Sequence, residues 1–103
     1  MTALSYTVTA TLPDEDTRRA YIGWLQAGHL EQVKAGGATS AQIVQVDEPP
    51  LPLEVQCRYV FPSRESFDVY LRDHAPALRS DGLARFGQAT GVRFRREVGT
   101  ILA

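Results

Sequence analysis

The segment from Leu4 to Leu12 constrains the fold of this chain more than any other feature. Over these nine residues, apolar side chains alternate strictly with serine or threonine. A period of two places alternate side chains on opposite faces of a β-strand. We therefore expect a half-buried strand whose apolar face lies in the core. Pro13 follows the strand and ends it.

A helix is expected to follow this strand. The acidic run Asp14 to Asp16 suits the positive end of a helix dipole, and Gly36-Gly37 is a typical helix stop. Between them the pattern predicts one helix that ends at about Ala35. Its apolar stripe has helical spacing, with two aromatic residues beside it: Ile22, Leu25, His29 and Val33, flanked by Tyr21 and Trp24.

The pattern in the middle of the chain predicts two strands joined by a hairpin loop. Residues 39–46 form the weaker strand, because their alternation is poor. Three prolines within residues 47–52 cannot donate to a β-ladder, so this segment is expected to be a stiff surface loop. Residues 53–61 then alternate clearly. Their apolar face is expected to be buried under the helices: Leu53, Val55, Cys57, Tyr59 and Phe61.

A second helix and a fourth strand complete the pattern. Ser63 is a suitable N-cap, and apolar residues recur at helical spacing to Leu78. Pro76 is expected to kink or restart this helix, because it removes a backbone hydrogen bond. We expect a turn near Asp81-Gly82 and a last strand over residues 92–102.

The order β-α-β-β-α-β predicts an α+β fold of the ferredoxin-like type. Four antiparallel strands would form one sheet with two helices on one face, in a single domain of residues 1–103. Two helices cover only one face of such a sheet. The other face would carry threonines and charged side chains, and three roles remain open for it: contact with solvent, ligand binding, or packing on a partner sheet.

Composition excludes several classes of function. The net charge of −1 and the isoelectric point near 6.1 give no general attraction for nucleic acid. The segment Cys57 to Phe61 faintly resembles an RNA-recognition strand, but its aromatic residues share the face expected to be buried. No apolar run is long enough to span a membrane. A single cysteine, Cys57, forms no intramolecular disulfide, so we expect a cytoplasmic protein.

The candidates for chemistry are the two histidines, His29 and His74, because imidazole titrates near neutral pH. Each is also compatible with a hydrogen-bonded structural role. An aromatic group that includes Trp24, Tyr59 and Tyr70 either fills the core or walls a small-molecule pocket. We expect no metal and no organic cofactor, since ligand spacing and phosphate-binding glycine motifs are absent from the sequence.

Short motifs are spread over nearly the whole chain: Trp24-Leu25, His29-Leu30, Gly36, Tyr59-Val60-Phe61, Tyr70-Leu71, His74 to Arg79, and Arg85-Phe86. Together they resemble small bacterial proteins of an uncharacterised domain family. That family belongs with the dimeric α+β-barrel superfamily, which includes antibiotic-biosynthesis monooxygenases and muconolactone isomerases. The resemblance implies a homodimer formed through the sheet, but no particular reaction. It directs attention to Trp24, His29, Tyr59, Tyr70, His74 and Arg79.

Three functions follow as hypotheses. The first is a homodimeric α+β-barrel protein of unassigned activity that binds a small molecule. The second is a cofactor-independent monooxygenase or isomerase acting on a small aromatic or enol-type substrate, with His29 or His74 carrying the proton. The third is an interaction module that docks a different protein through its sheet face. A pocket beside Trp24 and a histidine favours the first two, and a filled core favours the third.

Overall fold

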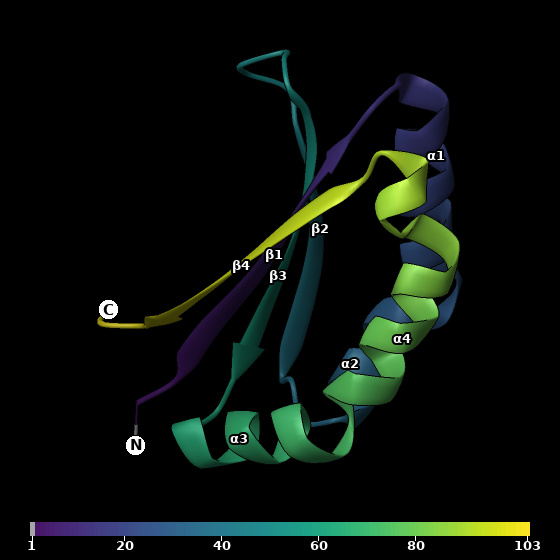
Figure 1. Ribbon diagram of the computed structural model, residues 1–103. Helices are drawn as coiled ribbons and strands as arrows, with labels where there is room; N and C mark the ends of the chain where they lie inside the picture. The colour runs from purple at the N-terminus through teal and green to yellow at the C-terminus, as the bar shows by residue number, and fades with distance from the viewer. Residues whose placement is uncertain (1) are drawn as a thin grey trace.

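The computed structural model describes residues 2–103, which form one antiparallel sheet with all helices on one side (Figure 1). The order of strands across the sheet is β2-β3-β1-β4, so the first and third strands lie at its centre. The βαββαβ order predicted from the sequence is confirmed. The strands are β1 (Leu4–Leu12), β2 (Ser40–Val46), β3 (Leu53–Phe61) and β4 (Arg93–Thr100).

The helical layer consists of two interrupted helices. The first comprises α1 (Glu15–Trp24), the π-helical segment η1 (Leu25–His29) and α2 (Leu30–Ala35). The second comprises α3 (Arg64–Asp73) and α4 (Ala75–Phe86), and a short 3-10 turn η2 (Gln88–Thr90) leads into β4. The hairpin loop between β2 and β3 extends beyond the sheet at the end far from the termini (Figure 1).

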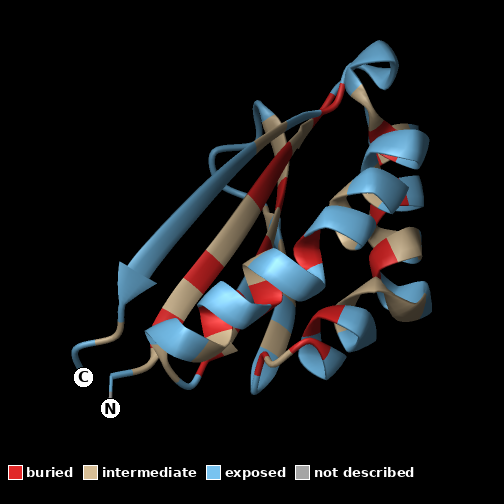
Figure 2. Ribbon diagram, turned by 60° about the horizontal axis from the view of Figure 1, so that its bottom comes forward, coloured by how far each residue is buried: buried red, intermediate tan, exposed pale blue. Residues whose placement is uncertain are grey.

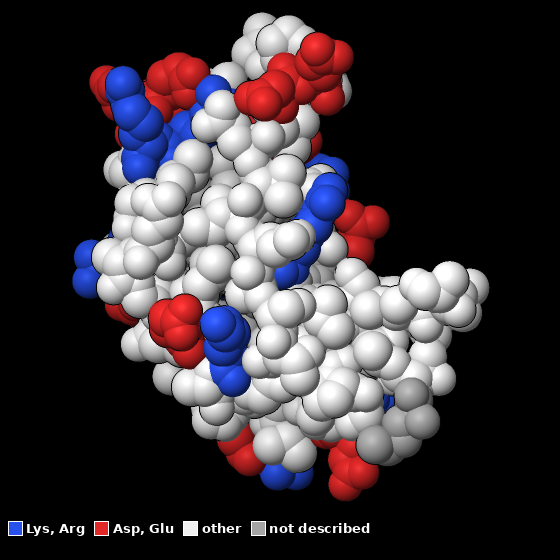
Figure 3. Space-filling view, turned by 180° about the vertical axis from the view of Figure 1, so that it is seen from behind, with Lys and Arg blue, Asp and Glu red and all other residues white. Residues whose placement is uncertain are grey.

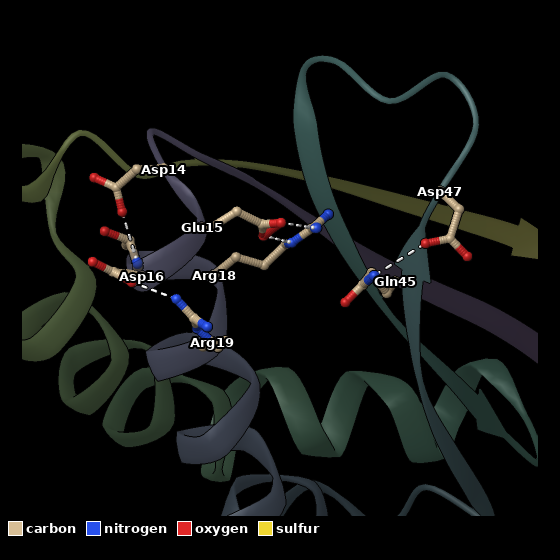
Figure 4. Close-up of polar contacts among 8 residues, drawn as sticks. Asp14, Glu15, Asp16, Arg18, Arg19, Gln45 and Asp47 are labelled. Atoms are coloured by element: carbon tan, nitrogen blue, oxygen red, sulfur yellow. Dashed lines mark hydrogen bonds and ion pairs between the residues drawn. The ribbon is translucent and has the colours of Figure 1, made fainter.

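Both predicted helix starts are capped by side chains. The Asp14 carboxylate accepts a hydrogen bond from the Thr17 amide at 2.7 Å, as seen in Figure 4. This bond lowers the pKa of Asp14. Ser63 forms a reciprocal capping box with Ser66. One turn into α1, Arg18 binds Glu15 through two hydrogen bonds of 2.7 Å each.

The first helix differs from the prediction of one continuous helix. The Leu30 amide bonds to the Leu25 carbonyl five residues earlier, which is π-helical spacing. Gly28 has φ 146°, outside helical geometry, and lies inside this segment. Glycine adopts such a positive φ without the steric penalty of a side chain. The π-helical turn contains one residue more than an α-helical turn, and it interrupts the helix. The segments on either side, α1 and α2, still pack against the sheet.

The second helix confirms one prediction and corrects another. It restarts at Pro76, whose ring occupies the first turn of α4 where a missing N–H is tolerated. The predicted turn at Asp81-Gly82 is wrong, because α4 continues through both residues to Phe86. Gly82 lies against the Trp24 ring, so its missing side chain serves a close contact and does not end the helix.

The core lies between the helices and the sheet, as the alternation of β1 and β3 predicts. Cys57 and Tyr59 are 1% and 2% exposed and face the helices together with Val55 and Phe61. Figure 2 shows this buried face of the sheet and the exposed outer faces of the helices. The strand register is therefore as predicted, and the aromatic residues of β3 are not available to stack on RNA bases.

The open face of the sheet is polar but not uniformly exposed. Thr9 is only 1% exposed, because Gln56 and Arg95 lie opposite it on the two neighbouring strands. The Arg95 guanidinium reaches across β1 to the Glu54 carboxylate on β3, at 3.1 Å. This ion pair bridges the two strands that flank β1, and the Thr9 hydroxyl beneath has no hydrogen-bond partner among residues 2–103.

The edge strand β4 is exposed along most of its length (Figure 2). Figure 3 shows acidic and basic side chains interspersed over the rear of the molecule, with no large patch of one sign in that view. Within residues 2–103, no helix has the length and apolar character needed to cross a membrane.

Candidate functional site

A cavity of about 50 Å³ lies between the sheet and the helical layer. Such a volume holds several water molecules or a small organic group. Strands β1, β3 and β4 form its floor, and α1, η1, α3 and α4 form its roof. Its walls are mainly aromatic and include Tyr21, Trp24, Tyr59, Tyr70 and Phe94.

The indole of Trp24 and the imidazole of His29 stack at this cavity, with ring centroids 4.3 Å apart and planes 27° from parallel. Residues five apart in a regular α-helix point about 140° away from each other, at about 100° per residue. The π-helical turn between them reduces that divergence, because its hydrogen bond spans five residues and the turn is wider than an α-helical one. The break in the first helix therefore creates the pair.

The imidazole of His29 is held in its neutral form. Burial lowers its pKa, and the negative charge of Asp81 opposes this effect only in part. The Nδ1 atom is buried and has no hydrogen-bond partner within residues 2–103. A neutral imidazole carries one nitrogen able to accept a proton, so His29 presents an unused polar group at the cavity.

Tyr21, Tyr59, Tyr70 and Cys57 keep their hydroxyl and thiol groups protonated at neutral pH. Burial raises the pKa of Tyr70 to about 12, and it also raises the pKa values of Tyr21 and Tyr59. Burial raises the pKa of the Cys57 thiol, against the opposing effect of the Tyr59 and Tyr21 hydroxyls. Cys57 is therefore a neutral wall residue and a poor nucleophile.

Two arginines border the cavity from opposite layers. Arg79 extends from α4 to β1, where its Nη2 donates a hydrogen bond of 3.2 Å to the Tyr6 hydroxyl. Its Nε is buried and lacks a partner among the described residues. Arg96 comes from β4, with its guanidinium 5.8 Å from the centre of the Phe94 ring. Both positive charges act on Tyr70, where they oppose the rise in its pKa.

Of the six positions singled out in the sequence, five border this cavity: Trp24, His29, Tyr59, Tyr70 and Arg79. His74 does not. It lies at the exposed junction of α3 and α4, where its ring stacks on the outer side of Tyr70 with centroids 6.4 Å apart. Gly36, at the end of α2, packs beside the His74 side chain.

Sequence reasoning missed Tyr6 and Arg96 as residues of the site. Tyr6 is an ordinary core residue by its alternation, and only its hydroxyl bond to Arg79 distinguishes it. Arg96 left a clearer signal, because it occupies the same face of β4 as Val92 and Phe94. A charged residue on the apolar face of a strand indicates a cavity or an opening beneath the helices.

Within residues 2–103, no three histidine, cysteine or acidic side chains gather closely enough to hold a metal ion. The cavity lining contains no aspartate or glutamate. What the cavity offers chemically is an aromatic enclosure, one neutral imidazole and two guanidinium groups.

The strand order β2-β3-β1-β4 with helices on one face defines a ferredoxin-like protein. Solved structures share this fold throughout. A dimeric ferredoxin-like protein from an uncultured marine organism is 14% identical, with a TM-score of 0.77 over 100% of this chain and 98% of that chain. The chain belongs to the family described as a domain of unknown function (DUF4286), whose model matches residues 3–101. This confirms the resemblance to an uncharacterised domain family.

Two further structures have informative descriptions. An ethyl tert-butyl ether d (ethd) family protein from Bacillus halodurans is 14% identical, with a TM-score of 0.73 over 99% of this chain and 100% of that chain. SnoaB, a cofactor-independent oxygenase from Streptomyces nogalater, is 10% identical, with a TM-score of 0.65 over 100% of this chain and 94% of that chain. At these identities the likeness establishes the fold. No curated protein matches the sequence.

Proposed function

We propose that this protein is a cytoplasmic homodimer that binds a small molecule in the cavity between its helices and its sheet. The observation that carries the proposal is the buried His29 Nδ1, which lies beside the stacked Trp24 ring and has no partner within residues 2–103. An unpaired buried polar group is costly to a folded protein. Such groups are retained where a ligand or a reaction uses them.

Binding can be tested by NMR with a set of small aromatic compounds, both neutral and charged. The indole N–H signal of Trp24 is a specific reporter, because the chain has one tryptophan. We expect saturable shifts of this signal and of other cavity residues.

A variant pair locates the binding site. Gly82→Val places a side chain against Trp24, since even a Cβ would lie 3.3 Å from the ring, and it should abolish binding. Ala84→Val adds a similar side chain to the exposed face of the same helix and should leave binding unchanged. If no compound shifts a cavity signal, the proposal is wrong.

The homodimer is proposed to form through the open face of the sheet. A hollow on this face is bordered by Ser5, Thr7, Gln56, Arg58 and Glu97, and no helix within the described residues covers it. The marine ferredoxin-like protein of similar fold is described as dimeric, which supports self-association of this chain.

Sedimentation equilibrium at micromolar concentration tests the association. A mass near 11.4 kDa would refute the dimer and favour an interaction module for a different protein. A stable dimer should bury at least about 1,000 Å² in total.

A cofactor-independent monooxygenase or isomerase is the second candidate, supported by the neutral state of His29. Both reactions can begin when a base takes a proton from an enol or phenol hydroxyl, or from an acidic C–H, leaving the substrate as an anion. His29 is proposed as that base and would become imidazolium in the step. His29→Gln should then remove turnover of such substrates, while His74→Gln, at the exposed junction, should retain it. Equal loss in both variants would contradict this role.

A further inference from the structure

We infer that the cavity selects a small planar carboxylate, with the carboxylate held by Arg79 and the flat body held between aromatic side chains. This inference rests on the proposed function, because it assigns a ligand class to the same cavity. Its main observation is independent of His29. Arg79 has a buried Nε donor with no partner within residues 2–103, although its Nη2 is already fixed on the Tyr6 hydroxyl.

The charge of Arg79 is uncompensated. No carboxylate of residues 2–103 forms an ion pair with Arg79 or Arg96. The exposed Arg58 and Arg93 also lack acidic partners, but among these four arginines only Arg79 has a buried nitrogen without a hydrogen-bond partner in this range. The cavity lining itself contains no acidic residue. A positive charge that is partly removed from water and unpaired creates a site for an anion.

The positive charge is directed into the cavity from two layers. Arg79 approaches from α4 and Arg96 from β4, and both act on the Tyr70 hydroxyl, which lines the cavity. Tyr6 is 3% exposed and belongs to the central strand β1, so the hydrogen bond to its hydroxyl anchors the Arg79 guanidinium to the centre of the sheet. A guanidinium held in this way is preorganised to accept an anion.

The rest of the cavity determines what kind of anion fits. Its other walls are aromatic or aliphatic, and aromatic walls favour flat, unsaturated bodies through offset stacking. A dianionic phosphate would lose a large hydration free energy on entering the cavity. Apolar walls and the one unpartnered Arg79 Nε donor cannot replace it. A monoanionic carboxylate needs fewer donors, and its planar group matches the guanidinium. The small volume limits the body to about one ring.

Benzoate and benzamide form a matched pair of probes, because they share a ring and differ in charge. We expect benzoate to shift the Trp24 indole signal saturably and to bind at least about tenfold more tightly than benzamide. Added salt should reduce the affinity for benzoate less than it reduces the affinity of a solvent-exposed arginine for an anion, because Arg79 is partly buried.

Arg79→Gln should reduce benzoate affinity by about tenfold or more and leave benzamide binding unchanged. Arg79→Lys keeps the charge but lacks the Nε donor, and should recover only part of the loss. Arg85→Gln is the matched control, since Arg85 lies on the same helix, is exposed and pairs with Asp81. If Arg79→Gln fails to fold, the preference of the wild-type protein for benzoate still decides the inference.

The outcomes separate this inference from the proposed function. If benzamide and other neutral rings bind in the cavity as tightly as benzoate, selection of an anion is refuted and small-molecule binding stands. If inorganic phosphate binds as tightly as benzoate, selection of a carboxylate is refuted. If neither charged nor neutral compounds shift any cavity signal, both the inference and the proposed function are wrong.

Discussion

Replacing Gly36 with alanine should destabilise the protein, because three segments of the helical layer meet at this residue. An added Cβ would lie 2.9 Å from Tyr70 Cδ1 and 3.1 Å from His74 Cγ. The backbone of Gly36 has φ −80° and ψ −3°, which alanine adopts without strain. The expected effect is therefore one of packing alone.

The magnitude follows from the contacts. Carbon atoms pack best at about 3.5–4.0 Å, so the new methyl group is too close to Tyr70 by roughly 0.6 Å or more. Tyr70 is 3% exposed and cannot move into solvent. Overpacking of this kind costs about 1–3 kcal/mol. Alanine also makes the unfolded chain less flexible than glycine does, which lowers the entropy cost of folding and stabilises the protein by roughly 0.4–1 kcal/mol. The midpoints of these two ranges differ by about 1.3 kcal/mol, which is the net loss that we expect.

Urea unfolding followed by circular dichroism measures this loss. Gly23→Ala is the matched control, because Gly23 lies on the exposed side of α1 and an added Cβ meets nothing within 4 Å. That variant should gain about 0.5–1 kcal/mol from helix propensity. The reasoning is refuted if Gly36→Ala is as stable as the wild type while Gly23→Ala gains stability as expected.

Three further predictions concern pH, capping and burial. The folded state holds the pKa of His29 below its unfolded value of 6.5, so the unfolded chain binds more protons between these two pKa values. The stability that this contributes is present above pH 6.5 and is lost as pH falls from 6.5 through the folded pKa. Urea unfolding over this pH range should show a smaller loss for His29→Gln. Ser63→Ala should cost about 1 kcal/mol by the same assay, since it removes the N-cap of α3; an unchanged midpoint would contradict the capping box. Cys57 should react with a thiol reagent far more slowly in native than in unfolded protein, because it is 1% exposed and its pKa is raised; equal rates would place it on the open face.

The sheet could be predicted from the sequence because its side-chain pattern has a simple cause. Strands β1 and β3 carry one buried and one polar face, and their observed bounds agree with the alternation. One misplaced residue would have exchanged the two faces, so the burial of Cys57 confirms the register of the whole strand. Helix starts and the break at Pro76 were also predictable, because caps and prolines act locally.

The interior of the helical layer could not be predicted in the same way. A glycine inside a helical pattern is compatible with a continuous helix, with a kink or with a close contact, and the chain uses all three options. Gly23 lies within regular helix, Gly28 takes φ 146° in the π-helical segment, and Gly82 admits the Trp24 ring. Each outcome depends on the partner across the layer, which local sequence does not reveal.

The interruptions of the two helices also explain why His29 and His74 were equal candidates in the sequence but have different surroundings in the structure. Each follows an aromatic residue on a helix, at a separation of five for Trp24 and His29 and of four for Tyr70 and His74. In a regular helix the four-residue pair would share a face and the five-residue pair would not. The π-helical turn turns His29 inward onto Trp24, whereas α3 ends at Asp73 and leaves His74 exposed at the junction. The position of each imidazole thus depends on how its helix is interrupted. The spacing of apolar residues on an ideal helix does not predict these interruptions.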